Sequence, residues 1–231
     1  PNSSKRPVVP FVPAEDIRGL RVGLVRESIG DGAATEEASE GLRRAMQVLR
    51  AAGATVTDVS LPLFPHGGMI CGGLSDAEAG FVHRHRLRER PQDFDFASRR
   101  RLMYGSLITG SEYAKLSRLR AMMRRDIMAL LDEVDVLVAP TQAEAAPKLQ
   151  TATGLTSKDA VLRQFFGSRA HRGTFSLAGV PGLSVPVGFS AEGLPLSMQI
   201  VGRPFGENTV MQVGQAYQQR TDWHEARPRL A

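Results

Sequence analysis

The sequence is poor in cysteine and in aromatic residues, and each shortage narrows what the protein can be. Cys71 is the only cysteine among 231 residues. This excludes an internal disulfide and a cysteine-rich metal site, and it favours a reducing, cytoplasmic location. Five histidines without a recurring ligand spacing predict no metal site, because His83 and His85 would face different sides of a helix. Aromatic residues make up 6% of the chain, too few to indicate a platform for stacking bases.

Long apolar runs and phosphate-binding motifs are also missing. No stretch of about 18 apolar residues predicts a membrane span. The first residues, Pro1–Pro7, lack the apolar core of a signal peptide. Neither a phosphate loop nor a dinucleotide fingerprint occurs, so no cofactor is expected. Residues 1–15 are rich in proline and predict an extended linker, and residues 16–231 predict part of an α/β domain.

The net charge of the chain is +5, and its basic residues are almost all arginines, since the chain has only four lysines. The basic residues are densest between Arg84 and Arg101. We interpret most of them as solvated helix faces, and nucleic acid is not an expected partner. The alternative is a contact with a carboxylate or RNA, for which the planar guanidinium is well suited.

Residues 21–59 carry the pattern of a strand, a helix and a second strand. Arg21–Val25 is a short apolar run typical of a buried strand. Thr35 is a candidate N-cap, with acids in the first turn after it, and Gly53 is a natural stop. Thr55–Val59 alternates as a strand does. A βαβ unit of this length predicts two parallel strands.

The rest of the chain continues the α/β pattern. We expect helices over 74–90, 94–108, 112–131 (capped by Ser111), 158–168 and 207–219, and strands over 134–139, 183–187 and 196–201, with a loop over 142–156. The predicted fold class is therefore α/β, with a mixed β-sheet covered by helices.

Two motifs are candidate sites of chemistry. His66-Gly67-Gly68 is similar to the oxyanion turn of some esterases, but no Gly-x-Ser-x-Gly nucleophile elbow accompanies it. Gly67, Gly68, Gly72 and Gly73 are therefore predicted to lie in a loop. Thr141 directly follows the strand predicted over 134–139. Ligands gather outside the carboxyl ends of strands in open α/β sheets, so Thr141 is a candidate pocket residue, with a turn-capping role as the alternative.

Five blocks in a fixed order resemble the amidase signature family. They are Asp16–Val25; Arg101–Gly105 with Ser111-Glu112-Tyr113 and Arg118-x-Arg120; Val134–Thr141; Thr174–Pro186; and Gly193–Arg203. Together they cover about residues 16 to 220, and they are similar to the C-terminal half of the family. The resemblance implies an amidase-signature-like fold that lacks its N-terminal half.

The resemblance also implies hydrolysis of carboxamides to carboxylate and ammonia. Family members use a triad of a nucleophilic serine, a second serine in a cis peptide bond, and a lysine that acts as base when neutral. No Gly-Gly-Ser-Ser run occurs, and the only serine pair is Ser3-Ser4. We therefore assign no catalytic residue here, expect the triad upstream, and predict that this segment alone is inactive.

The segment is expected to supply pocket walls. Arg101 matches the arginine before the family's helical glycine, and in tRNA-dependent amidotransferases an arginine in this neighbourhood reads the substrate carboxylate. The predicted substrate-binding residues are therefore Arg101, from the resemblance, and Thr141, from its place after a strand. Ser176 replaces the usual asparagine, and residues 168–173 carry bases where an acid would hold a substrate amine. These departures favour a neutral or aromatic amide as substrate.

The alternatives are a non-catalytic binding module of the same fold and the A subunit of a tRNA-dependent amidotransferase. The expected partners are a small-molecule amide and the missing catalytic half. If the catalytic half is missing, the apolar edge that it would cover is exposed, and this exposed edge favours self-association of the chain into a homo-oligomer.

Overall fold

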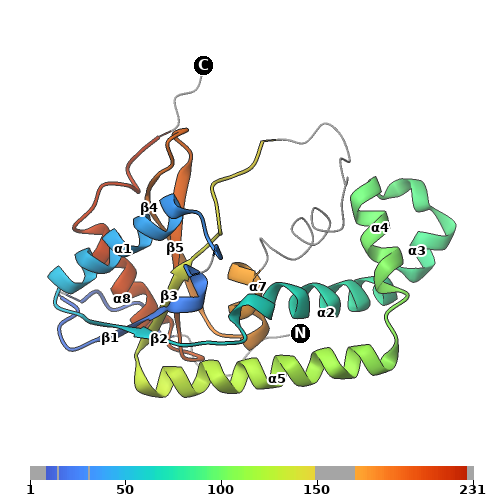
Figure 1. Cartoon of the computed structure of the whole chain (residues 1–231), viewed down its shortest axis with the longest axis horizontal. Coiled ribbons are helices and arrows are strands. Elements are labelled where there is room, and N and C mark those ends of the chain that lie inside the picture. The colour runs from blue at the N-terminus through green and yellow to red at the C-terminus, as the bar shows by residue number, and fades with distance from the viewer. Residues whose placement is uncertain (1–8, 15, 31, 149–169, 228–231) are drawn as a thin grey trace.

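The computed structural model describes residues 9–14, 16–30, 32–148 and 170–227, and it has a mixed five-stranded sheet (Figure 1). The strand order is β2-β1-β3-β5-β4. The strands are β1 (Arg21–Val25), β2 (Thr55–Val59), β3 (Val136–Pro140), β4 (Gly182–Phe189) and β5 (Pro195–Gly202). Strand β1 is parallel to β2 and β3, whereas β5 is antiparallel to β3 and β4. The predicted α/β class with a mixed sheet is confirmed.

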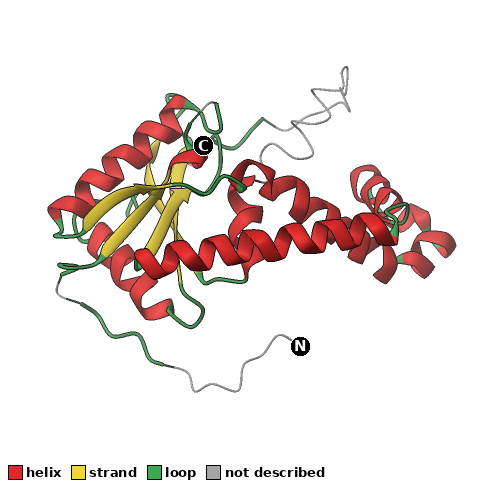
Figure 2. Ribbon diagram, turned by 60° about the horizontal axis from the view of Figure 1, so that its bottom comes forward, coloured by secondary structure: helices red, strands yellow, loops and turns green. Residues whose placement is uncertain are grey.

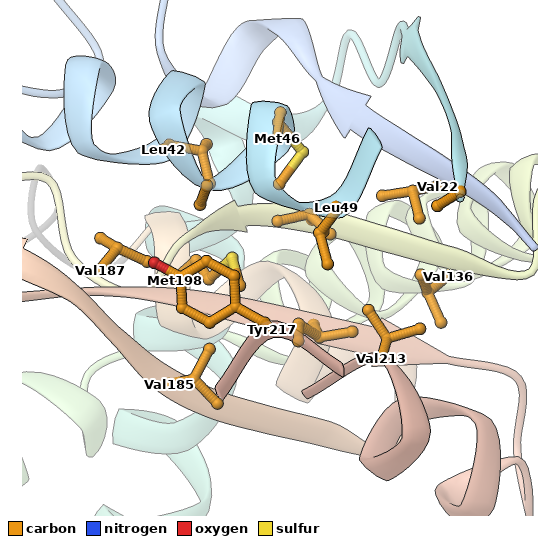
Figure 3. Packing of buried hydrophobic residues seen from close by; sticks show 14 of the residues in the cluster. Val22, Leu42, Met46, Leu49, Val136, Val185, Val187, Met198, Val213 and Tyr217 are labelled. Carbon is orange, nitrogen blue, oxygen red and sulfur yellow. The ribbon is translucent and has the colours of Figure 1, made fainter. Parts of the chain in front are cut away.

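Helices cover both faces of the sheet. They are α1 (Glu36–Ala51), α2 (Gly67–Val82), α3 (Arg84–Glu89), α4 (Phe96–Gly105), α5 (Gly110–Glu133), α7 (Ala170–Ala178) and α8 (Glu207–Gln218). Alternation along β3 separates the two faces, since Val136 and Val138 join one apolar cluster and Leu137 and Ala139 the other. Helices α1 and α8 pack on the first face around Tyr217 (Figure 3), and α2, α5 and α7 pack on the second.

The βαβ unit forms as its local signals predict. Thr35 caps α1 by accepting a hydrogen bond from the Ala38 N–H, and Gly53 follows the helix with a φ of +96°. A left-handed backbone at this position suits glycine because it has no Cβ. The predicted strands at 183–187 and 196–201 are confirmed as the β4–β5 hairpin, whose turn contains Gly193 at φ +77°.

Helices α2 and α5 extend beyond the sheet and form an arm that carries α3 and α4 at its far end (Figure 2). The prediction of a loop at Gly67, Gly68, Gly72 and Gly73 was wrong, because all four lie in α2. Gly67 packs against Thr174 of α7, and a Cβ on Gly80 would lie 2.9 Å from the Leu102 carbonyl oxygen of α4. These glycines serve close helix packing, which is a tertiary effect that overrides local propensity.

Three helix boundaries differ from the predictions. The helix expected over 74–90 begins at Gly67 and is interrupted at His83. Helix α4 is capped by Asp95, whose carboxylate accepts hydrogen bonds from the N–H groups of residues 97 and 98. Thr109, not Ser111, caps α5, in a reciprocal capping box with Glu112. The helix predicted over 158–168 lies outside the described residues.

The described part of the N-terminal segment, residues 9–14, has no regular structure and lies against α8. The Val12 N–H donates to the Asn208 side chain (2.8 Å), and the Gln212 side chain donates to the Val12 carbonyl (2.9 Å). Residues 142–148 form no helix or strand, as expected for the start of the predicted loop. Among the described residues, no helix has the length and apolarity that crossing a membrane requires.

Candidate functional site

Polar side chains follow all three parallel strands at their carboxyl ends. Glu27 and Ser28 come after β1, Ser60 after β2, and Thr141 after β3. The Glu27 carboxylate accepts hydrogen bonds from the Ser60 hydroxyl (2.5 Å) and the Leu61 N–H (2.8 Å). Burial raises the pKa of Glu27, but these hydrogen bonds outweigh it and leave the pKa below its usual value. An ionised Glu27 thus ties the ends of β1 and β2 together.

Thr141 occupies the position that its sequence context predicts. Its N–H donates to the Ser197 carbonyl of β5 (2.9 Å), and its hydroxyl lies 2.9 Å from the hydroxyl of Ser184 on β4. Ser184 is exposed and Thr141 is half-buried. The pair therefore presents two hydroxyl groups toward solvent, each able to donate and accept a hydrogen bond.

Two buried polar side chains, His171 and Gln199, form hydrogen bonds at this end of the sheet. The imidazole Nε2 of His171, on α7, lies 2.8 Å from the Ser28 carbonyl oxygen. The side-chain amide of Gln199, on β5, donates to the Pro140 carbonyl (3.0 Å) and to the His171 carbonyl (2.6 Å). Gln199 therefore fixes α7 against the end of β3, beside Thr141.

His171 is held in its neutral form. Its side chain is buried, and burial lowers the pKa of the imidazole, opposed in part by the hydrogen bond to Ser28. Donation from Nε2 to a carbonyl places the proton on that nitrogen. The buried Nδ1 has no hydrogen-bond partner among the described residues.

The basic residues of the segment 168–173 differ in whether a ligand can reach them. Residues 168 and 169 lie outside the described residues, and His171 is buried in its neutral form. Arg172 and Ser176 are exposed on α7, and the Ser176 hydroxyl donates to the Arg172 carbonyl (2.9 Å). Within the described part of this segment, Arg172 is the cation that a ligand can reach.

Arg101 lies on α4, in the arm, and forms an ion pair with Asp76 of α2. The Asp76 side chain is 7% exposed, and that of Arg101 is 35% exposed. The buried Arg101 Nε has no hydrogen-bond partner among the described residues. Because a guanidinium carries five N–H donors, the ion pair leaves Arg101 able to bind a second anion.

The structure does not bring the two predicted pocket residues together. Arg101 is part of α4 at the end of the arm, whereas Thr141 follows β3 in the sheet (Figure 1). Neither of them lines the arm cavity of about 890 Å³. Sequence reasoning missed Ser184, His171 and Gln199. Gln199 belongs to the last of the five family-like blocks, and that block was the signal that could have identified it.

The described residues include no buried lysine and no metal site. Lys115 and Lys148, the two lysines that the structure describes, are both exposed. No group of three or more histidine, cysteine, aspartate or glutamate side chains is placed to hold a metal ion in this part of the chain.

Comparison with known proteins places this geometry in a family. The family model described as Amidase matches residues 2–211. The A subunit of a glutamyl-tRNA(Gln) amidotransferase from Chloroflexus aurantiacus is 35% identical over 93% of this chain and 47% of its own. A crystal structure of an amidase has a TM-score of 0.75 at 28% identity, covering 90% of this chain and 47% of that one.

A second solved structure agrees. It belongs to a vestigial protein complex linked to the origins of an s-triazine catabolic enzyme, and it has a TM-score of 0.74 at 26% identity over 89% of this chain and 44% of its own. The chain spans about half the length of the curated relatives it matches.

Proposed function

The chain belongs to the amidase family, and from this premise we propose that it is the C-terminal part of an enzyme that hydrolyses carboxamides to carboxylate and ammonia. The observation that carries the proposal is the family match over residues 2–211, together with the structural match to an amidase at a TM-score of 0.75. The Ser–cis-Ser–Lys triad belongs to a segment upstream of this sequence. The enzyme acts in the cytoplasm.

In this proposal the chain contributes binding surface rather than the nucleophile. The amide group of a substrate has both a hydrogen-bond donor and an acceptor, and the paired hydroxyls of Thr141 and Ser184 can satisfy either. The buried side chains of His171 and Gln199 position these hydroxyls by fixing the end of β3 against α7. The exposure of Lys115 and Lys148 supports a triad located elsewhere.

The test compares this chain with the longer product of its own gene. We expect the 231-residue protein to release no ammonia from a panel of aliphatic and aromatic amides. The longer product should do so, and it should lose the activity when the upstream lysine is changed to alanine. Turnover by the shorter protein that is lost when one of its own serines is replaced would overturn the proposal.

A second candidate is the A component of a tRNA-dependent amidotransferase. It is favoured by the relatives that carry that name at 30% and 35% identity. The property that would identify this candidate is binding of tRNA by the protein. Binding of tRNA that weakens steeply between about 50 and 200 mM salt would support this candidate, because phosphate contacts release counterions. Absence of tRNA binding by the longer gene product removes it and leaves the amidase.

One edge of the sheet bears on assembly. Strand β4 is an edge strand of the described sheet, and its side chains range from buried, as at Val185 and Val187, to exposed, as at Ser184 and Phe189. We propose that the catalytic half covers surface on this side, and that the isolated chain self-associates through it. Size-exclusion chromatography of the chain with and without the upstream segment tests this assignment.

A further inference from the structure

The arm contains a cavity that is separate from the proposed amide site. Its volume is about 890 Å³, within the range of small-molecule pockets. Its walls come from α2, α3, α4 and the start of α5, so it lies at the end of the arm, away from the sheet (Figures 1 and 2). The cavity therefore shares no wall with Thr141 and Ser184.

Most of the lining is apolar and accessible. The apolar lining residues include Ala77, Phe81, Leu87, Met103, Leu107 and Ile108. Phe81 is 66% exposed and Leu107 is 78% exposed. Large apolar side chains gathered around one concave surface mark a site of interaction rather than an ordinary solvated surface.

Two arginines on one face of α3 line the cavity and lack an acidic partner. Arg84 and Arg88 are four residues apart, which places them on the same side of the helix. Within the described residues, neither forms an ion pair. Arg86, on the opposite side of α3, and Arg90, which follows the helix, do not line the cavity, and both are paired with Asp93. The two arginines of α3 that lack an acidic partner thus face the cavity.

Arg84 is already fixed in position. Its guanidinium carbon lies 4.2 Å from the centre of the Phe81 ring, and its Nη1 donates to the Phe81 carbonyl (2.8 Å). Stacking and hydrogen bonding reduce the entropy that the side chain would lose on binding. The remaining N–H groups are available for a carboxylate, which a guanidinium binds through two parallel hydrogen bonds.

The charges around the cavity favour a ligand with one negative charge. Glu78 is the acid that lines it, and its carboxylate accepts a hydrogen bond from the Tyr113 hydroxyl (2.9 Å). Two arginines and one glutamate leave one positive charge to be neutralised. The positive end of α5 adds little, because Thr109 and Glu112 already cap it.

We propose that the arm cavity binds a free amphipathic monocarboxylate, whose carboxylate pairs with Arg84 and Arg88 and whose alkyl or aryl body lies against the apolar wall. The site stands independently of the proposed amidase function, because no residue of the amide site contributes to it.

Isothermal titration calorimetry of the purified 231-residue protein tests the site with octanoate, decanoate and 1-octanol. We expect one octanoate per chain. Decanoate should bind about 15-fold more tightly, since each buried methylene strengthens binding about fourfold. The alcohol, which has the same tail and no charge, should bind at least tenfold more weakly than octanoate.

Three variants and one control separate the contribution of the charges from that of the apolar wall. Arg84→Gln and Arg88→Gln should each weaken octanoate binding about tenfold and leave octanol binding unchanged. Arg90→Gln is the matched control, since Arg90 directly follows α3 and does not line the cavity, and it should change neither affinity. Leu107→Ser, at a mostly exposed position, should weaken both ligands. Far-UV circular dichroism confirms that each variant is folded.

Three results would overturn the proposal. The first is equal affinity for octanoate and octanol. The second is equal loss of octanoate binding in Arg84→Gln and Arg90→Gln. The third is binding only to phosphatidylglycerol vesicles with none to monomeric octanoate, which would identify the arm as a membrane-contacting surface.

Discussion

The guanidinium of Arg101 on α4 pairs with the carboxylate of Asp76 on α2, and this ion pair joins two helices of the arm. The resemblance to the family also predicts that this arginine binds substrate, a role that stays a prediction. Arg101 therefore combines a structural contact with a predicted binding role. Because Asp76 is nearly buried, the structural contact is the easier of the two to measure.

Asp76→Asn should lower the free energy of unfolding by about 2 kcal/mol, less than the loss for a fully buried pair because the freed Arg101 can reach water. Asp132→Asn is the matched control, since Asp132 pairs with Arg203 at the surface and should contribute no more than about 1 kcal/mol. Urea denaturation at pH 7 measures both. Equal effects of the two changes would show that the Asp76 pair is no stronger than a surface pair.

The start of α5 provides a second test of local structure. Thr109→Ala should lower the free energy of unfolding by about 1 kcal/mol, because the Thr109 hydroxyl accepts the Glu112 N–H (3.2 Å). Ser111→Ala should have a smaller effect, since Ser111 lies inside the helix. Chemical denaturation of both variants compares the two sites. A larger loss for Ser111→Ala would contradict the observed capping box.

The cap of α5 is an example of a local signal that is present in the sequence, although the prediction chose Ser111 instead. Thr109 and Glu112 stand three residues apart, which is the capping-box spacing, and this pattern distinguishes Thr109 from Ser111 without a structure. The signals around Thr35 and Gly53 are equally local, and there the predictions are confirmed. Elements whose ends depend on nearby residues could therefore be predicted.

The α2 helix shows the opposite case. Its glycines indicated a loop because glycine lowers helix propensity. In the structure, Gly173 of α7 and Gly67 of α2 allow the two helices to approach closely, and a Cβ on Gly173 would lie 2.9 Å from the Cys71 Cβ. Contacts between residues so far apart in the chain carry no local pattern.

The same reasoning applies to the candidate site. The end of a strand could be predicted as the place of Thr141, because strands have a local signature. Its partner Ser184 lies 43 residues later on an antiparallel strand, and the pairing follows only from the strand order. The ion pair of Arg101 with Asp76 likewise depends on how α4 packs against α2.

His171 predicts a pH dependence of stability. Its folded-state pKa lies below the ordinary value of 6.5, so the unfolded chain binds a proton that the folded chain does not. This contribution is fully present above pH 6.5 and is lost as the pH falls below 6.5 toward the lower folded-state pKa. Urea denaturation from about pH 7.5 to 5 should show falling stability, with a smaller fall in His171→Gln. His66→Gln, at an exposed position, is the control and should retain the wild-type slope.

Thr141→Val tests the candidate pocket in the longer gene product that we propose to be the active enzyme. The change removes the hydroxyl that pairs with Ser184 and keeps the shape of the side chain. Because the pair lies at the surface, the free energy of unfolding should change by no more than about 0.5 kcal/mol. If the hydroxyl contacts the bound amide, KM should rise severalfold while kcat changes little, the signature of binding energy lost equally from the ground and transition states.

A matched change separates binding from a general effect on the sheet. Ser197→Ala alters β5 beside Thr141 but keeps the Ser197 carbonyl that accepts the Thr141 N–H. Its KM should equal that of the wild type. If Thr141→Val and Ser197→Ala give the same KM, the Thr141 hydroxyl serves only to join β3 to β4. The substrate wall would then have to be sought among other exposed side chains near this edge, with Arg172 on α7 as the first candidate.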